Sequence, residues 1–291
     1  MSRFCRLFAG VAVSLAFAFV AAAQDQSQGS IPKVLQITRE FVKPGKGGTA
    51  HQKAESAFVN AMRNAKWPTY YLAVTSLTGK PRVLFLTSYA SFEAWEKDGA
   101  AVDSNATLSA TLDRAFTADG ELLDSVDQGV FVYQEELSLR PKADISHMRF
   151  LEASIYHVRP GHDPEWQQLV KMVKAGYEKA LPDAHWATLQ EFFGGEGGNY
   201  LVLTSRKTLG EIDQDIMNDK KFAAAMGEDG MKKLDELFAA SVDTHQHNLF
   251  AFEPKMSYVD PAWIKADPDF WKPKMAAPAA KSDSADKKAK P

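Results

Sequence analysis

The chain has 291 residues, a formal net charge of −3 at pH 7 and a single cysteine, Cys5. Its mild acidity argues against nucleic acid as a partner, because nucleic-acid binding depends on positive charge that meets the phosphates. Since Cys5 lies in a predicted leader, the mature chain has no thiol, which excludes disulfides, thiolate nucleophiles, iron–sulfur clusters and cysteine zinc sites.

The first 23 residues have the order of a cleavable signal peptide. Two arginines precede an apolar run over residues 7–20, and three alanines follow it before Gln24. The run is shorter than the roughly 20 residues of a typical membrane span. We therefore expect cleavage after residue 23, a periplasmic or secreted protein, and no membrane attachment of the mature chain. Cleavage removes two positive charges and lowers the net charge from −3 to −5.

After a polar lead-in over residues 24–33, hydrophobic periodicity predicts seven elements in the first half of the mature chain. A strand that ends at a Pro-Gly pair comes first, and a helix with an apolar stripe at Ala54, Phe58 and Met62 follows. A hairpin follows at residues 69–78 and 82–89. Two helical stretches come next, at residues 91–97 and 104–126, and a strand at residues 129–139 closes the unit.

The second half repeats this order. Its first helix carries a stripe at Trp166, Val170, Val173 and Tyr177. A hairpin follows at residues 186–193 and 200–205. Two helical stretches come next, at residues 209–219 and 221–242, and a strand at residues 249–258 closes the unit. We expect an ordered extension over residues 262–274 and a disordered tail over residues 275–291, which is rich in Ala, Lys, Pro, Ser and Asp.

Three short motifs recur at a spacing of 116 or 117 residues, which indicates a tandem duplication. They are VKPG and VRPG at 42 and 158, LFLTS and LVLTS at 84 and 201, and SVD at 125 and 241. The sequence therefore predicts one unit over residues 34–141 and a second over 150–261, joined by a linker at 142–149.

Each unit has the order β-α-β-β-α-β of the ferredoxin-like plait, whose sheet carries helices on one face only. Because the other face needs a cover, we predict an α+β fold in which the two units pack sheet to sheet as a pseudo-symmetric barrel. With both sheets on one chain, we expect a monomer.

The element order and the repeated motifs over residues 34–261 resemble the dimeric α/β-barrel superfamily. Its members include proteins like the antibiotic-biosynthesis monooxygenases, EthD-like and NIPSNAP-like proteins, and haem-binding chlorite dismutases. The resemblance lies at the level of fold, which does not fix function, and no single family is assigned.

The first strand alternates apolar residues, such as Leu35 and Ile37, with polar ones. We expect the apolar face to meet the helices, so that the polar face lines a cavity between the sheets. The residues expected to bind a ligand there come from these polar faces and from the start of the second strands; they are Gln36, Thr38, Tyr70, Ser154 and Trp186.

Two carboxylates on the same polar faces, Glu40 and Glu152, are candidate catalytic bases, because desolvation would raise their pKa; Tyr156 lies beside them. The alternative is that both are solvated at the rim or paired with arginine.

Five of the seven histidines lie in the second unit. Of these, His185, His245 and His247 are candidate ligands for a metal or haem iron. No His-x-x-x-His or Glu-x-x-His spacing supports such a site, so we expect neither a metal nor a cofactor.

These patterns favour a small-molecule binding protein with its ligand in the cavity between the sheets. A cofactor-independent monooxygenase-like enzyme, with Glu40 or Glu152 as the base, is the alternative that the resemblance implies, and a haem-binding protein is the third. Since the sequence carries no specific catalytic motif, whether the protein is an enzyme stays open.

Overall fold

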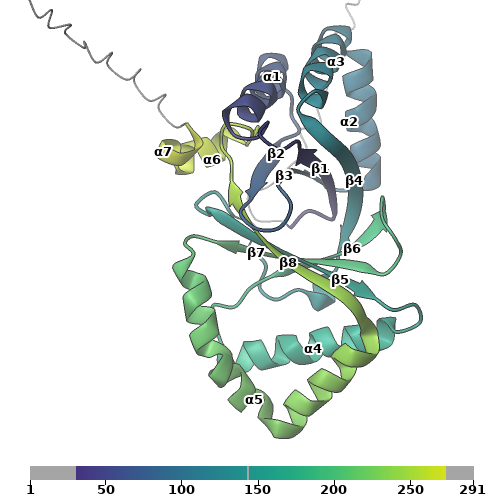
Figure 1. Cartoon of the computed structure of the whole chain (residues 1–291), viewed down its shortest axis with the longest axis vertical. Coiled ribbons are helices and arrows are strands. Elements are labelled where there is room, and N and C mark those ends of the chain that lie inside the picture. Colours follow the sequence, from purple (N-terminus) through teal and green to yellow (C-terminus); the bar gives the residue numbers. More distant parts are fainter. Residues whose placement is uncertain (1–30, 143, 273–291) are drawn as a thin grey trace, which may run out of the picture.

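The computed structural model describes residues 31–142 and 144–272, and the predicted leader and tail lie outside them. The strands form a central layer, with α1, α2 and α3 on one side of it and α4 and α5 on the other (Figure 1). Among the described residues, no helix is both long and apolar enough to serve as a membrane span.

The first unit has the predicted order. Its elements are β1 (Val34–Val42), α1 (Thr49–Ala65), β2 (Tyr71–Ser76), β3 (Arg82–Tyr89), α2 (Phe92–Ser104), α3 (Ala106–Gly120) and β4 (Leu123–Tyr133). A short 3-10 helix, Glu135–Leu137, leads into the connection to the second unit.

The second unit follows with β5 (Phe150–Val158), α4 (Asp163–Ala180), β6 (Ala187–Phe193), β7 (Asn199–Arg206), α5 (Gly210–Ser241) and β8 (Val242–Phe252). Two short helices, α6 (Pro261–Ala266) and α7 (Pro268–Trp271), come after it.

All eight strands close into one barrel in the order β1-β3-β2-β8-β5-β7-β6-β4. The pairs β2–β8 and β4–β6 join the two units, and every pair is antiparallel. The predicted fold class, α+β with two ferredoxin-like units packed sheet to sheet, is therefore confirmed.

The predicted faces of the strands are wrong. Leu35 and Ile37 belong to the core between the sheets, together with leucines of β2, β3, β5, β6 and β7. Val34, Gln36, Thr38 and Glu40 therefore face the helices. Both sheets enclose the barrel interior, and the apolar strand faces line it.

The closing strands begin six or seven residues earlier than predicted, at Leu123 and Val242. Residues 124–128 of β4 and 243–247 of β8 are exposed, so alternation of apolar and polar residues does not mark this half of either strand. The third repeated motif, SVD at 125 and 241, does not occupy equivalent positions in the two units. Leu123 pairs with Val42 and Val242 pairs with Val158, so the equivalent positions of β4 and β8 are 119 residues apart.

Helix α5 was predicted as two helices that break near residue 220. The structure has two helical stretches within α5, as predicted, but the break lies at Gly227, whose φ of 69° is in the left-handed region.

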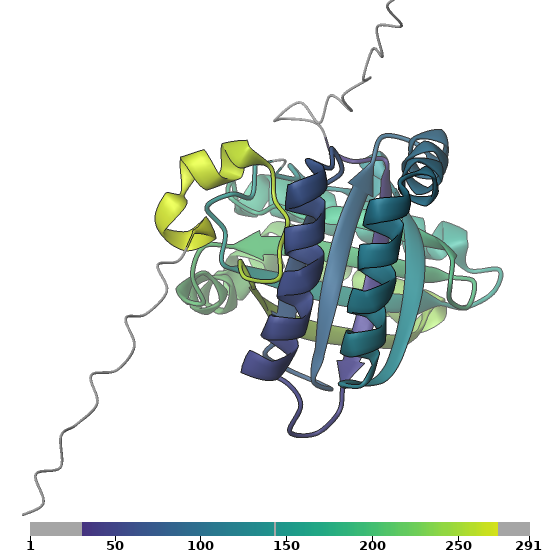
Figure 2. The same ribbon diagram turned by 90° about the horizontal axis from the view of Figure 1, so that it is seen from above.

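The C-terminal helices flank the barrel (Figure 2). Trp271 is buried, and its Nε1 donates a hydrogen bond to the carbonyl of Ser146 at 2.8 Å. Its ring packs against Trp263, with the ring centroids 5.4 Å apart. The segment is thus ordered as far as residue 272, and residues 273 and 274 of the predicted extension lie outside the described residues.

Candidate ligand-binding cavity

A cavity of about 400 Å³ opens at the end of the barrel where β1, β2, β5 and β6 begin. Its wall is apolar and comes from both units. Six strands each contribute one leucine to it: Leu35, Leu72, Leu86, Leu151, Leu189 and Leu203. Ala187 of β6 also lines this wall. A cavity of this size and character suits a small, mainly apolar molecule.

Aromatic side chains gather at the mouth of the cavity. They are Tyr70, Tyr133, Trp186 and Trp263, whereas Tyr71 and Tyr89 border the cavity but pack their rings on the helix-facing side of the sheet. The indole Nε1 of Trp186 donates to the carbonyl of Leu137 at 2.9 Å, which fixes the position of the ring. Tyr70 packs on Tyr258 of the C-terminal segment with the centroids 5.2 Å apart. The mouth is therefore built from rings whose neighbours hold them in place.

The charged groups at the rim are mostly positive. Lys33 and Lys142 line the cavity and are exposed. Asp260 is the only carboxylate among the described residues that line it, and its Oδ1 accepts a hydrogen bond from the backbone N–H of Ala262 at 2.7 Å, as the N-cap of α6. Two lysines thus face the solvent at the mouth beside one carboxylate that already caps a helix.

Two of the predicted ligand-binding residues, Tyr70 and Trp186, line this cavity, and their role in binding stays a prediction. Gln36, Thr38 and Ser154 were expected on the cavity wall, and this placement is wrong because they lie on the helix-facing side of their strands. Gln36 contacts Gln128, and the Oγ of Ser154 lies 2.7 Å from Nδ1 of His247. The apolar residues of the wall were missed because they were assigned to the helix-facing layer.

The proposed catalytic carboxylates do not line the cavity either. Glu152 accepts a hydrogen bond from Nη2 of Arg206 at 2.9 Å, and Arg206 also pairs with Asp215. Glu152 is therefore paired with arginine, as in the alternative interpretation. Tyr156 packs on Trp166 of α4, with ring centroids 5.1 Å apart, and burial raises its pKa.

Glu40 belongs instead to a buried polar cluster between β1 and the helices, which we call the β1–α1–α3 cluster. Its other members are His51 and Glu55 of α1 and Asp119 of α3. Burial, together with the charges of Glu40 and Asp119, raises the pKa of Glu55 to about 10. Burial and Glu40 also raise the pKa of Asp119, to about 6. A His and a Glu four residues apart on a predicted helix were the sequence signal that could have indicated this cluster.

Of the three candidate histidines, His185 lies apart from the other two. Both ring nitrogens of His185 face backbone carbonyls, Nδ1 that of Asp183 at 2.9 Å and Nε2 that of Ser205 at 3.0 Å, so neither is free to bind a metal. His245 and His247 are neighbours on β8, with ring centroids 5.3 Å apart, on the helix-facing side of the sheet. Burial and the nearby His245 lower the pKa of His247.

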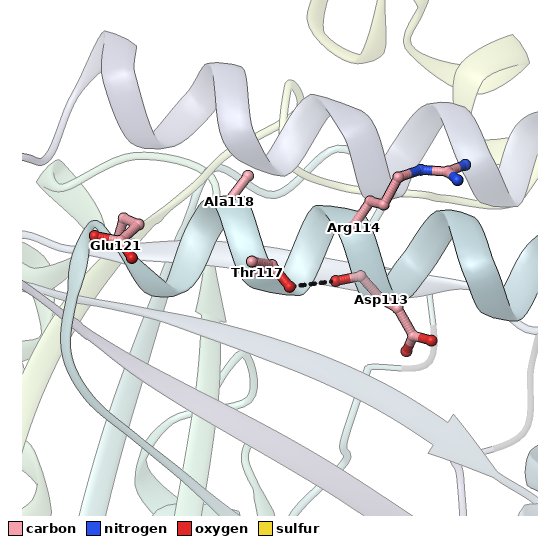
Figure 3. Close-up of a pocket in the computed structure, with 5 residues that line it drawn as sticks. All are labelled: Asp113, Arg114, Thr117, Ala118 and Glu121. Atoms are coloured by element: carbon pink, nitrogen blue, oxygen red, sulfur yellow. Dashed lines mark hydrogen bonds between the residues drawn. The ribbon is translucent and has the colours of Figure 1, made fainter.

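A second depression of about 400 Å³ lies on the outer surface of α3 (Figure 3). It is lined by five exposed residues of one stretch of chain: Asp113, Arg114, Thr117, Ala118 and Glu121. The hydroxyl of Thr117 donates to the carbonyl of Asp113 within the same helix. Since no second element encloses this depression, it is not a candidate binding site.

No protein-family model matches the chain, and no curated protein matches it. Solved structures do. A candidate monooxygenase from Fusobacterium nucleatum has a TM-score of 0.50 and 11% identity, covering 76% of this chain and 92% of its own. An anthrone oxidase-like protein has a TM-score of 0.49 and 13% identity, covering 77% and 93%. A haem-binding protein from Thermus thermophilus has a TM-score of 0.44 and 10% identity, covering 81% and 95%.

At these identities the likeness concerns the fold alone. The chain has two ferredoxin-like units closed into one α/β barrel, and the predicted resemblance is confirmed at the level of the fold.

Proposed function

We propose that the protein binds a small, mainly apolar molecule in the barrel cavity. The enclosed wall of six leucines supports this most directly, because both units contribute to it and no side chain fills the space. A ligand that buries apolar surface there gains about 25 cal/mol per Å² removed from water. The aromatic mouth adds flat, rigid contact surfaces at little cost in conformational entropy.

The rim favours a ligand with one anionic group. Lys33 and Lys142 are the exposed cations beside the mouth, and Asp260 is engaged as a helix cap. A ligand that places its apolar body among the leucines would leave a carboxylate or sulfonate near these two ammonium groups. Each such pair is solvent-exposed and contributes modestly, so the lysines select among ligands of similar apolar area.

The proposal is tested by thermal unfolding with matched ligands, for example naphthalene-2-carboxylate and naphthalene-2-methanol. Binding to the folded state raises the melting temperature, and we expect a larger rise with the acid. The double variant Lys33→Met, Lys142→Met should bind both compounds alike. Lys53→Met, an exposed position on α1, is the control and should keep the preference for the acid. If no apolar compound shifts the melting temperature, the cavity is not a binding site.

The geometry does not favour the two alternatives in their predicted form. Glu40 and Glu152, the proposed bases of an oxygenase, lie outside the cavity wall. His185 is the only histidine among the described residues of that wall, and backbone carbonyls face both of its nitrogens. Export to the periplasm or exterior remains part of the proposal, and it is supported by the leader-like order of residues 1–23.

A further inference from the structure

The β1–α1–α3 cluster places four potential ligand atoms around one point. Nε2 of His51 lies 3.0 Å from Oε2 of Glu40, 3.4 Å from Oδ1 of Asp119 and 3.9 Å from Oε1 of Glu55. All four ligand atoms lie within 4.8 Å of one another. The residues come from three elements, and His51 and Glu55 share a face of α1 because they are four residues apart.

The cluster is buried, and it holds more acidic groups than basic ones. The exposed fractions of Glu40, His51, Glu55 and Asp119 are 5%, 2%, 3% and 2%. Within the described part of the chain, no lysine or arginine forms an ion pair with any of the three carboxylates, and His51 is their one basic neighbour. Buried carboxylates are costly unless they are paired or bind a cation.

Two oxygens of the cluster have no hydrogen-bond donor. Oε1 of Glu55 and Oδ1 of Asp119 are buried and unpartnered, and both lie within 4 Å of Nε2 of His51. The hydroxyl of Tyr71, which feels the charges of Glu55 and Glu40, is buried and unpartnered as well. Buried polar atoms in native proteins almost always have a partner, so these oxygens need either the proton that Glu55 keeps and shares with Asp119 or a cation that replaces it.

The second unit shows that the fold itself does not demand a polar cluster here. Tyr156 occupies the place on β5 that Glu40 has on β1, 116 residues earlier. Trp166 of α4 packs on Tyr156, and this contact corresponds to that of His51 of α1 with Glu40. Phe238 of α5 belongs to the same apolar cluster as Trp166. An apolar filling therefore serves this layer in one unit, whereas the other unit keeps one histidine and three carboxylates.

We propose that Glu40, His51, Glu55 and Asp119 bind one divalent transition-metal ion, and that Zn²⁺ is the ion their spacing suits best. Zinc bound at 2.0 to 2.2 Å by four ligands at the corners of a tetrahedron separates them by about 3.4 Å. The three separations from Nε2 of His51 span 3.0 to 3.9 Å around that value. One imidazole with carboxylates suits such ions better than Ca²⁺, which prefers six to eight oxygens.

A site closed by four protein ligands is structural in character. It would hold α1 and the end of α3 against β1, on the opposite side of the sheet from the cavity. Ligand binding in the cavity and metal binding in the cluster are therefore separable properties.

The test is calorimetric titration of metal-stripped protein with ZnCl₂, with CaCl₂ as the control ion. We expect one equivalent of Zn²⁺ to bind and to raise the melting temperature, and Ca²⁺ to do neither. Glu55→Gln and Asp119→Asn keep the side-chain volume and should each lose the zinc-induced rise. Asp113→Asn, exposed on the same helix as Asp119, should bind zinc as the parent does.

Circular dichroism establishes that each variant is folded before titration. If Glu55→Gln does not fold, Asp119→Asn still tests the proposal. Failure of the parent to bind Zn²⁺ would overturn the proposal. So would zinc binding that survives in Glu55→Gln and Asp119→Asn but is lost in His245→Ala, since the ion would then bind on β8.

Discussion

Gly194 is the residue whose backbone conformation restricts substitution most clearly. It has a φ of 102°, and a Cβ there would lie 2.1 Å from the carbonyl oxygen of Gln128 on β4. Gly197 in the same turn between β6 and β7 has no heavy atom within 4 Å of such a Cβ. We predict that Gly194→Ala lowers the free energy of unfolding by about 1–3 kcal/mol or more. Gly197→Ala should stay within about 0.5 kcal/mol.

Chemical denaturation of the two variants measures both values. Equal stability of Gly194→Ala and the parent would mean that the β6–β7 turn does not approach β4 as closely as the structure has it.

At this scale the sequence indicates which residues share a face of a strand, but not which layer that face meets. The alternation in β1 correctly places Leu35 and Ile37 on one face. Either face could meet the helices, and the prediction assigns this one to them. That choice misplaces Gln36, Thr38 and Glu40 together, because all side chains of a face move as one. The prediction for Tyr70 and Trp186 does not depend on the choice of face, because these residues were assigned to the mouth from their position at the start of the second strands.

Among the elements, the C-terminal segment is held by a charge pair besides the packing of Trp271. Asp267, the N-cap of α7, accepts a hydrogen bond from Arg149, which lowers the pKa of Asp267 below its ordinary value of 3.8. A lowered pKa means that the pair stabilises the fold above about pH 3.8. This contribution is lost as the pH falls through the folded-state pKa.

We therefore predict that Asp267→Asn has a lower melting temperature than the parent at pH 7 and that the difference shrinks as the pH approaches 3. Asp269→Asn, exposed on the same helix, should match the parent at both pH values. A difference between Asp267→Asn and the parent that does not change between pH 7 and pH 3 would rule out the charge pair as its cause.

The sequence predicts elements best where a strand is strongly apolar and lies between clear turns. Strand β3 runs over residues 82–89 as predicted, since its four buried residues at 83–86 form an apolar run bounded by turns. The closing strands were displaced because residues 124–128 and 243–247 are exposed, and their polarity resembles that of a helix surface. Periodicity carries no information where neither face of an element is buried.

For the whole molecule, barrel closure within one chain predicts a monomer. The inner face of the first unit, with Leu35, Ile37 and Phe131, is covered by the second unit. Exposing it would cost about 25 cal/mol per Å² of apolar surface. Light scattering of the full protein should give the mass of one chain, whereas a fragment of residues 24–142 should aggregate or self-associate. A well-folded monomeric fragment would contradict mutual covering by the two sheets.

The central claim is that the barrel cavity holds a ligand, and a fluorescence titration with anilinonaphthalene sulfonate tests it most directly. This probe joins an aromatic body to one anionic group, as the leucine wall and the two rim lysines require. Ala187→Phe places a benzyl group into the cavity, and Ala100→Phe makes the same change on the exposed side of α2. We predict that the parent and Ala100→Phe enhance the fluorescence of the probe alike and that Ala187→Phe loses at least tenfold in affinity, about 1.4 kcal/mol. Undiminished binding by a folded Ala187→Phe variant would contradict the claim.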